Sequence, residues 1–213
     1  MAYQLADFPF LTTLLLCCVA GLLAILATPA RHTRAIKIVS AVFSGLTLVI
    51  SIYLFIAYDQ QAGGYQFVER VAWIPELGIA YFNGVDGFAL PMLLLTGIVF
   101  FTAVLTCWEM ELRVKEFFAL VFLLVAGVFG LFMSLDLFFI FVWFDVSLFP
   151  MYLLIAIWGS TRKEYGAMKL TLYLLAGSAL ILPAIVYLVV HSGAMTFDLL
   201  VLMEGDRFTP CLL

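Results

Sequence analysis

The residues that could carry proton chemistry are acidic side chains inside long apolar runs. Asp145 is the clearest case, because residues 141–152 read Phe-Val-Trp-Phe-Asp-Val-Ser-Leu-Phe-Pro-Met-Tyr and contain no other charged residue. An ionised group at the middle of a membrane costs at least about 2.5 kcal/mol, so such groups are few and usually functional. Burial favours the neutral carboxyl, which lets the group exchange a proton near neutral pH. We therefore predict that Asp145 relays protons; the alternative is a hydrogen-bonded acid that only holds helices together.

Three further ionisable residues lie near the ends of apolar runs. Asp136 falls at a predicted turn, where a solvated acid or the N-cap of the following helix is expected ahead of a functional role. Lys169 opens the last apolar run, and snorkelling to the membrane surface is the expected role ahead of one in a site. His191, at the other end of that run, could accept a proton, although an interfacial histidine is more often incidental.

Pro150 and Pro183 lie inside two of the apolar runs. Neither residue has a backbone N–H, so the carbonyls of Val146 and Ala179 lose their helical donors and each helix should kink. Broken helices line ion paths in transporters, whereas a simple packing kink is the alternative. Because Pro150 is close to Asp145, we count it as a possible supporting residue.

These residues must be positioned by membrane helices. Hydrophobic residues make up 66% of the 213-residue chain and charged residues 11%, with a mean hydropathy of +1.18. A soluble domain is about half apolar and a quarter charged. Runs near the length of about 20 residues that spans a bilayer lie at Phe10–Thr28, Ile36–Tyr58, Phe88–Trp108, Phe117–Met133, Leu137–Trp158 and Met168–Val190. We break the stretch 117–158 at Ser134 and Asp136, because one helix of that length would be about 63 Å long, twice the thickness of the hydrocarbon. The predicted fold class is an all-α integral membrane protein with about six transmembrane helices.

Basic residues predict the orientation. Eight of them lie in or beside the first, third and fifth loops, at positions 31, 34, 37, 113, 115, 162, 163 and 169, and two lie elsewhere, at 70 and 207. Positive charge stays preferentially in the cytoplasm during insertion, so both termini and the loop 59–87 should lie outside. The net charge of −4, with no basic cluster interleaved with aromatic residues, argues against nucleic acid as a partner.

The long second loop, residues 59–87, has the pattern of a β-hairpin. A β-rich stretch from Tyr65 to Trp73 and a second one from Ile79 to Phe82 flank a turn at Pro75 and Gly78. We expect this hairpin to be a cap or a docking surface and see no catalytic constellation in it. The sequence also contains no metal-binding spacing of cysteines, no haem-ligating histidine pair and no nucleotide-binding glycine motif, so we expect no redox centre or metal in this chain.

Several motifs resemble the antiporter-like, proton-translocating membrane subunits of respiratory complex I. The resemblance is carried by Asn-Gly-Val-Asp-Gly-Phe-Ala-Leu-Pro at 83–91, Lys-Glu-Phe-Phe at 115–118 and Ser-Leu-Asp-Leu-Phe-Phe at 134–139, and by residues 158–178 around Lys169. The Pro-Met-Tyr that ends at Tyr152 is similar to chain M, called chain 4 in mitochondria, and adds Tyr152 to the possible supporting residues.

This resemblance implies a fourteen-helix fold with two inverted five-helix repeats. Residues 1–116 would be an N-terminal three-helix membrane region with an external hairpin loop (59–87). Residues 117–213 would begin the first proton-channel repeat and be truncated after the sixth helix, so that this chain alone should be inactive. Asp145 takes the place of the family's fifth-helix acid, usually a glutamate, whose lysine partner in the seventh helix has no counterpart here. The segment 195–203 resembles the amphipathic stretch that precedes that helix.

The implied function is proton translocation by a non-redox subunit of an NADH:quinone oxidoreductase in a bacterial inner membrane. NADH, FMN, Fe-S clusters and quinone are expected in other subunits, and the implied partners are other membrane subunits of complex I and the lipid bilayer. Two alternatives stay open: a cation/proton antiporter or membrane-bound hydrogenase subunit of the same fold, and a structural or assembly membrane protein that transports nothing.

Overall fold

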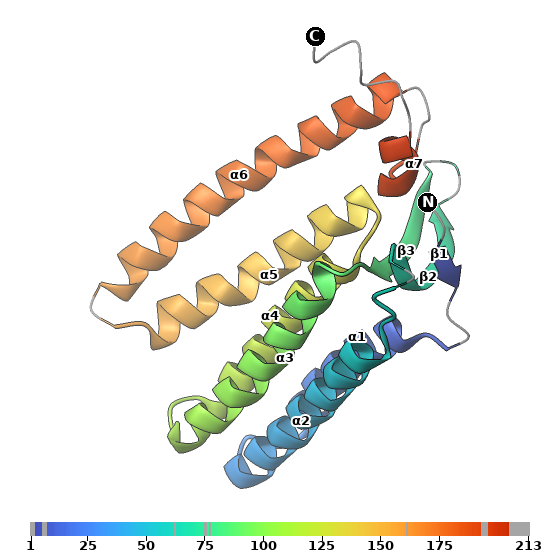
Figure 1. The fold of residues 1–213 in the computed structure, drawn as a ribbon. Coiled ribbons are helices and arrows are strands. Elements are labelled where there is room, and N and C mark those ends of the chain that lie inside the picture. The colour runs from blue at the N-terminus through green and yellow to red at the C-terminus, as the bar shows by residue number, and fades with distance from the viewer. Residues whose placement is uncertain are drawn as a thin grey trace.

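The computed structural model describes residues 3–5, 8–61, 63–74, 76, 78–160, 162–192 and 196–204. Within these residues, six helices are long and apolar enough to cross a membrane, as predicted. They are α1 (Phe10–Ala27), α2 (Thr33–Ala57), α3 (Ala89–Thr106), α4 (Val114–Met133), α5 (Leu137–Trp158) and α6 (Lys163–Ser192) (Figure 1). The predicted boundaries agree closely except in α6, which begins five residues before the predicted Met168. Lys169 therefore lies inside the helix rather than at its start.

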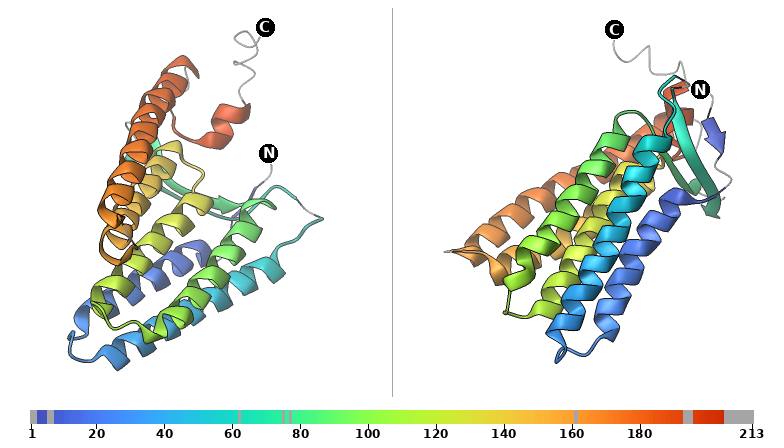
Figure 2. Two further views of the ribbon diagram at one scale, coloured as in Figure 1. Left: turned by 90° about the vertical axis from the view of Figure 1, so that its left-hand side faces the viewer. Right: turned by 60° about the horizontal axis from the view of Figure 1, so that its bottom comes forward.

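The helices are packed unevenly. α1 to α4 form the densest part, in which Phe100, Phe118, Phe122 and Phe129 are almost completely buried. α5 packs on α4, and α6 packs mainly on α5, so α6 lies at the edge of the layer (Figure 2). Few side chains of α5 and α6 are buried as a result, and most of their apolar surface is open.

A glycine allows α4 and α5 to approach closely. A Cβ added at Gly130 of α4 would lie 2.3 Å from ring carbon Cδ2 of Trp143 in α5, well inside van der Waals contact. Small residues at such crossings let membrane helices pack backbone to backbone, which lipid cannot otherwise drive.

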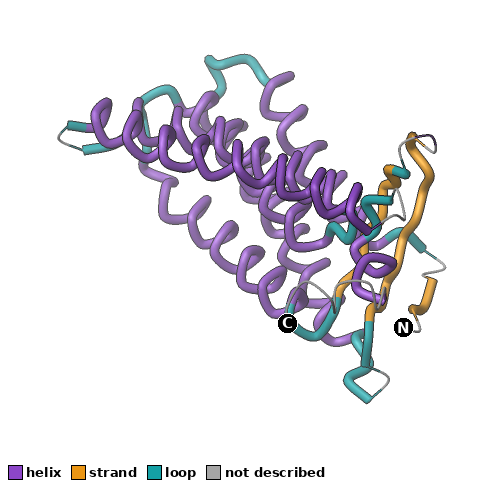
Figure 3. Tube along the Cα trace, turned by 90° about the horizontal axis from the view of Figure 1, so that it is seen from above, coloured by secondary structure: helices purple, strands orange, loops and turns teal. Residues whose placement is uncertain are grey.

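The strands gather at one end of the helical layer, here called the hairpin end (Figure 3). β2 (Tyr65–Ile74) pairs antiparallel with β3 (Ile79–Val85), which confirms the predicted hairpin, although β3 runs three residues further than expected. The predicted turn residue Pro75 lies outside the described residues, and Gly78 adopts a positive φ of 69°. A short parallel strand that the sequence did not indicate, β1 (Tyr3–Leu5), adds to the free side of β2.

The break between α4 and α5 extends this sheet. The backbone N–H of Leu135 donates to the carbonyl of Phe82 in β3 at 2.8 Å. On the other side of the break, the N–H of Leu137 donates to the carbonyl of Phe197 at 2.9 Å, and that of Leu199 to the carbonyl of Leu135 at 3.0 Å. The segment 134–136 thus lies between β3 and residues 197–199, just before the short helix α7 (Leu199–Glu204). Backbone pairing joins segments far apart in sequence at this end.

The opposite end, here called the basic end, holds the loops at 28–32, 110–113 and 159–162. Three lysines there bond carbonyls near helix ends: Lys115 donates to Leu26 at 2.7 Å, Lys37 to Trp108 at 2.6 Å and Lys163 to Ile157 at 2.7 Å. A cation at a helix C-terminus satisfies orphan carbonyls and is favoured by the helix dipole. The basic residues of this end therefore also cap α1, the 3₁₀ turn at Cys107–Glu109 and α5.

Candidate functional site

Asp145 is positioned by α5, eight residues after the helix begins at Leu137. Its side chain is partly exposed overall, but its Oδ1 atom is buried and has no hydrogen-bond partner within the described residues. Buried polar atoms are nearly always hydrogen-bonded, so an orphaned carboxylate oxygen calls for an explanation in function or in a missing partner.

A pocket of about 240 Å³ opens beside this oxygen, between α5 and α6. Its α5 side consists of Asp145, Leu148, Phe149 and Tyr152. These residues follow the spacing i, i+3, i+4 and i+7, which places them on one face of a helix. The α6 side is formed in the same way by the i, i+4 pair Thr171 and Leu175. The lining is therefore mostly apolar, with one carboxyl group and two hydroxyl groups.

Pro150 lies in α5 between the pocket residues and is buried. α5 nevertheless continues without interruption from Leu137 to Trp158, so the proline does not end the helix. The missing N–H leaves the carbonyl of Val146, next to Asp145, without its helical donor. α6 likewise runs continuously through Pro183.

Asp136 is the N-cap of α5 and lies away from the pocket. Its Oδ1 accepts hydrogen bonds from the N–H groups of Phe138 and Phe139 at 2.9 and 3.4 Å, and its Oδ2 accepts one from Ala80 of β3 at 2.9 Å. Burial raises the pKa of this carboxyl, against the opposing effect of the three N–H donors, and the negative charge of Asp198 raises it further. The carboxylate has a complete structural role as a cap that also fastens β3 to α5.

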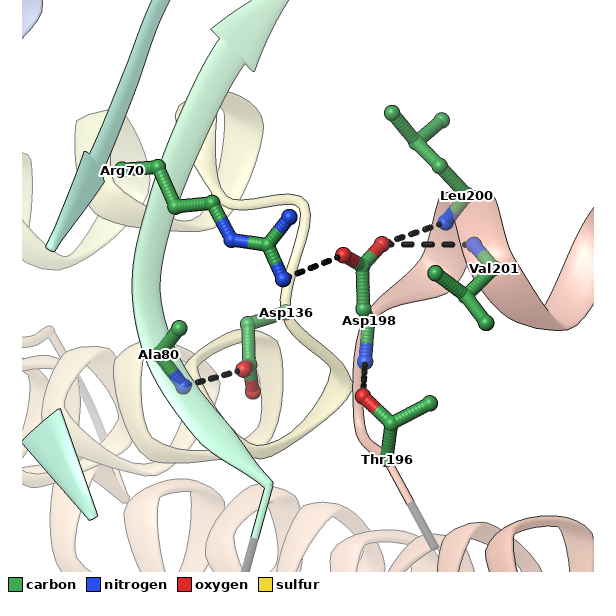
Figure 4. A network of polar contacts seen from close by, with 7 residues as sticks. All are labelled: Arg70, Ala80, Asp136, Thr196, Asp198, Leu200 and Val201. Atoms are coloured by element: carbon green, nitrogen blue, oxygen red, sulfur yellow. Dashed lines mark hydrogen bonds and ion pairs between the residues drawn. The ribbon is translucent and has the colours of Figure 1, made fainter. Parts of the chain in front are cut away.

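Asp198 and Arg70 complete a polar network at the hairpin end (Figure 4). Asp198 Oδ1 caps α7 by accepting from the N–H groups of Leu200 and Val201 at 2.9 and 3.3 Å. Its Oδ2 lies 3.1 Å from Nη2 of Arg70, whose guanidinium also lies over the ring of Phe82 at 5.1 Å. This network joins β2 to α7 and shows that the hairpin docks on its own chain.

Lys169 and His191 do not join the pocket. Lys169 is exposed, and its position two residues before Thr171 places it on the opposite side of α6. The His191 ring stacks on Tyr187, with centroids 4.9 Å apart, at the hairpin end of the helix. The structure thus brings together Asp145, Pro150 and Tyr152 among the predicted residues, and separates them from Asp136, Lys169 and His191.

Two features were missed by sequence reasoning. Thr171 was passed over because the search of the apolar runs considered ionisable residues, although a hydroxyl one helical turn from Leu175 on α6 was visible. Glu69 was passed over as a loop acid; it is 9% exposed, and its carboxylate accepts hydrogen bonds from the start of α1. Adjacent positions on a strand face opposite sides, so Glu69 and Arg70 were bound to meet different neighbours. No cluster of potential metal ligands occurs in the described part of the chain.

Comparison with known proteins agrees with this architecture. The family model described as NADH:quinone oxidoreductase/Mrp antiporter, TM, matches residues 134–210, which include α5 and α6. NAD(P)H-quinone oxidoreductase chain 4 of Nostoc sp. is 33% identical over 92% of this chain. A chain of respiratory complex I from Thermus thermophilus with bound NADH superposes with a TM-score of 0.80 at 26% identity, covering 92% of this chain. This chain belongs to the antiporter-like membrane subunit family. A chain of the Mrp complex from Dietzia sp., with a TM-score of 0.71 at 19% identity over 92% of this chain, shares the fold.

The relatives in the antiporter-like family are much longer. This chain spans 37% of the Nostoc protein, 39% of the Thermus chain and 21% of the Dietzia chain. The expectation that the chain resembles the first part of a chain 4 type subunit is confirmed, as is its nature as a multi-pass membrane protein. The roles of the site residues stay predictions.

Proposed function

We propose that this chain takes part in proton translocation as an antiporter-like subunit of an NADH:quinone oxidoreductase, with Asp145 as the group that exchanges the proton. The observation that carries the proposal is the buried, unpartnered Oδ1 of Asp145 at a pocket between two membrane helices. A carboxyl group in that setting is costly to keep ionised and costly to leave unpaired, so it is poised to take up a proton.

The setting within a complex is proposed from the relatives, whose names are those of NAD(P)H-quinone oxidoreductase subunits and complex I. Electron transfer would occur in other subunits, which would hold NADH, FMN, Fe-S clusters and quinone. The partners of this chain would be other membrane subunits. The open apolar surface of α5 and α6 is consistent with further helices packing there.

The proposed orientation follows from the charges at the two ends. Eight of the ten basic residues belong to loops or helix starts at the basic end, which we place in the cytoplasm. The hairpin end would then lie outside, on the side to which protons are delivered.

The test replaces Asp145 in the intact complex within its own membranes. Asp145→Asn keeps the shape but removes the titrating proton, so NADH-driven acidification of inverted vesicles should fall at least tenfold. Asp145→Glu should retain activity, because it restores a carboxyl group. Glu164→Gln, an exposed acid in the first turn of α6, is the matched control and should have no effect.

The same experiment separates the alternatives. Normal pumping by a fully assembled Asp145→Asn complex would refute the proposal and favour a structural role for the chain. Sodium-dependent proton flux without NADH would favour the antiporter, whose fold the Dietzia Mrp complex shares.

A further inference from the structure

The polar groups of the α5–α6 pocket complement one another. The hydroxyl proton of Thr171 is used within α6, where Oγ1 donates to the carbonyl of Ala167 at 2.8 Å. The Thr171 oxygen can therefore act toward the pocket as an acceptor. Tyr152 brings a phenolic O–H that can donate, and Asp145 Oδ1 is an acceptor without a partner. What the pocket lacks is a molecule that donates twice and accepts once.

We propose that Tyr152 and Thr171 are positioning residues that hold a water molecule against Oδ1 of Asp145, and that this water brings the proton from the basic end. The inference rests on the proposed function, because it names the groups that supply the proton to Asp145. Such a water would donate to Asp145 and to Thr171 and accept from Tyr152. Three hydrogen bonds are typical of a buried water in a protein.

The pocket is large enough for more than one water. A single water needs roughly 10 to 15 Å³ of space measured in this way, whereas about 240 Å³ is available. Its three apolar residues, Leu148, Phe149 and Leu175, limit where water can be bound. The hydroxyl groups therefore determine which water stands beside the carboxyl group.

The position of the lining residues gives the direction of approach. Tyr152 lies seven residues beyond Asp145, about 10 Å further along α5 toward the basic end. Thr171 lies eight residues from the start of α6 at that same end, about 12 Å along its axis. The pocket has no lining residue in the part of α5 before Asp145, on the side of the hairpin end, among the residues that the structure describes. Water reaches the carboxyl group from the basic end.

The proton step is a transfer without redox chemistry. An O–H bond forms at Oδ1 of Asp145 as the neighbouring water releases that proton, and this water takes up a proton from the next water toward the basic end. Neither Tyr152 nor Thr171 gains or loses a proton overall. Their role is to fix the orientation of the water, which makes them positioning residues.

The test removes one hydroxyl at a time from the assembled complex. Thr171→Val and Tyr152→Phe should each lower proton pumping about three- to tenfold, the loss expected from one hydrogen bond at a transfer step. Thr171→Ser should restore pumping. Thr102→Val is a matched control, because Thr102 in α3 makes the same bond to a carbonyl four residues earlier but is exposed and far from the pocket. Tyr173→Phe, on the exposed side of α6, is the control for Tyr152→Phe.

An infrared signature separates positioning from simple packing. The carboxyl C=O stretching band that disappears in Asp145→Asn should shift in Thr171→Val and Tyr152→Phe and return to its place in Thr171→Ser. An unshifted band with wild-type pumping in both variants, while Asp145→Asn is inactive, would overturn this inference and leave the proposed function standing. Wild-type pumping by Asp145→Asn would overturn the proposed function and the inference with it.

Discussion

Glu69 fastens the hairpin to the first helix, and its replacement should weaken the fold measurably. Its carboxylate accepts from the N–H of Leu11 at 2.8 Å, from the N–H of Thr12 at 3.1 Å and from the hydroxyl of Thr12. These N–H groups belong to the first turn of α1, where no intrahelical acceptor exists. In Glu69→Ala both N–H groups lose their partner, and the negative charge near the helix start is lost as well.

The expected loss follows from these contacts. Each N–H group left unsatisfied costs about 1 to 3 kcal/mol when buried, and a charge at a helix start contributes about 0.3 to 1 kcal/mol. Water can reach the end of a helix in part, so the lower values apply and the free energy of unfolding should fall by about 3 kcal/mol. Glu69→Gln keeps one carbonyl acceptor and should cost roughly half as much.

The measurement is unfolding of the purified chain in mixed dodecylmaltoside and SDS micelles, followed by far-ultraviolet circular dichroism. Glu76→Ala is the matched control, because Glu76 belongs to the same loop but is exposed, and its replacement should change stability by less than about 0.5 kcal/mol. Equal stabilities of Glu69→Ala and Glu76→Ala would show that the bond to α1 contributes nothing and would refute the reasoning.

Two other predictions concern packing and orientation. Gly130→Ala should lower the free energy of unfolding by about 1 to 3 kcal/mol, because its Cβ would overlap the ring of Trp143; Gly177→Ala, with no neighbouring atom within 4 Å, should be neutral or slightly stabilising. A stable Gly130→Ala chain would mean that α4 and α5 are less tightly packed than described. In intact cells, a membrane-impermeant thiol reagent should label a cysteine at Gln60, in the hairpin loop, and spare one at Ala30, at the basic end. The opposite labelling pattern would reverse the proposed orientation.

The six helices could be predicted because a membrane helix satisfies its backbone within its own segment. Local hydropathy and length then decide where each one lies, and the break at Ser134 and Asp136 followed from length alone. The start of α6 was placed too late because hydropathy marks the edge of the apolar run, whereas the helix continues beyond it. Residues from Lys163 onward are polar but compatible with a helix.

The site was predicted in part, for a physical reason that differs between its residues. Asp145 could be found because an acid in an apolar run is conspicuous on energetic grounds. Thr171 could not be linked to it, because α6 is apolar nearly all round and its sequence does not say which side meets α5. The pairing of residues 134–136 with β3 and with 197–199 depends on partners more than fifty residues away, which no local pattern specifies.

The sheet at the hairpin end also has a meaning in time. Arg70 is synthesised 128 residues before Asp198, its partner in the ion pair, an interval of roughly 6 to 25 s at ordinary rates of translation. During that interval α3 to α6 must enter the membrane while the edge of β3 waits, first for Leu135 and then, through the same turn, for residues 197–199. An unpaired strand edge is a natural target for chaperones and proteases. Closure of the sheet would therefore report that the sixth helix has been inserted, so this end of the molecule can serve as a record of completed assembly.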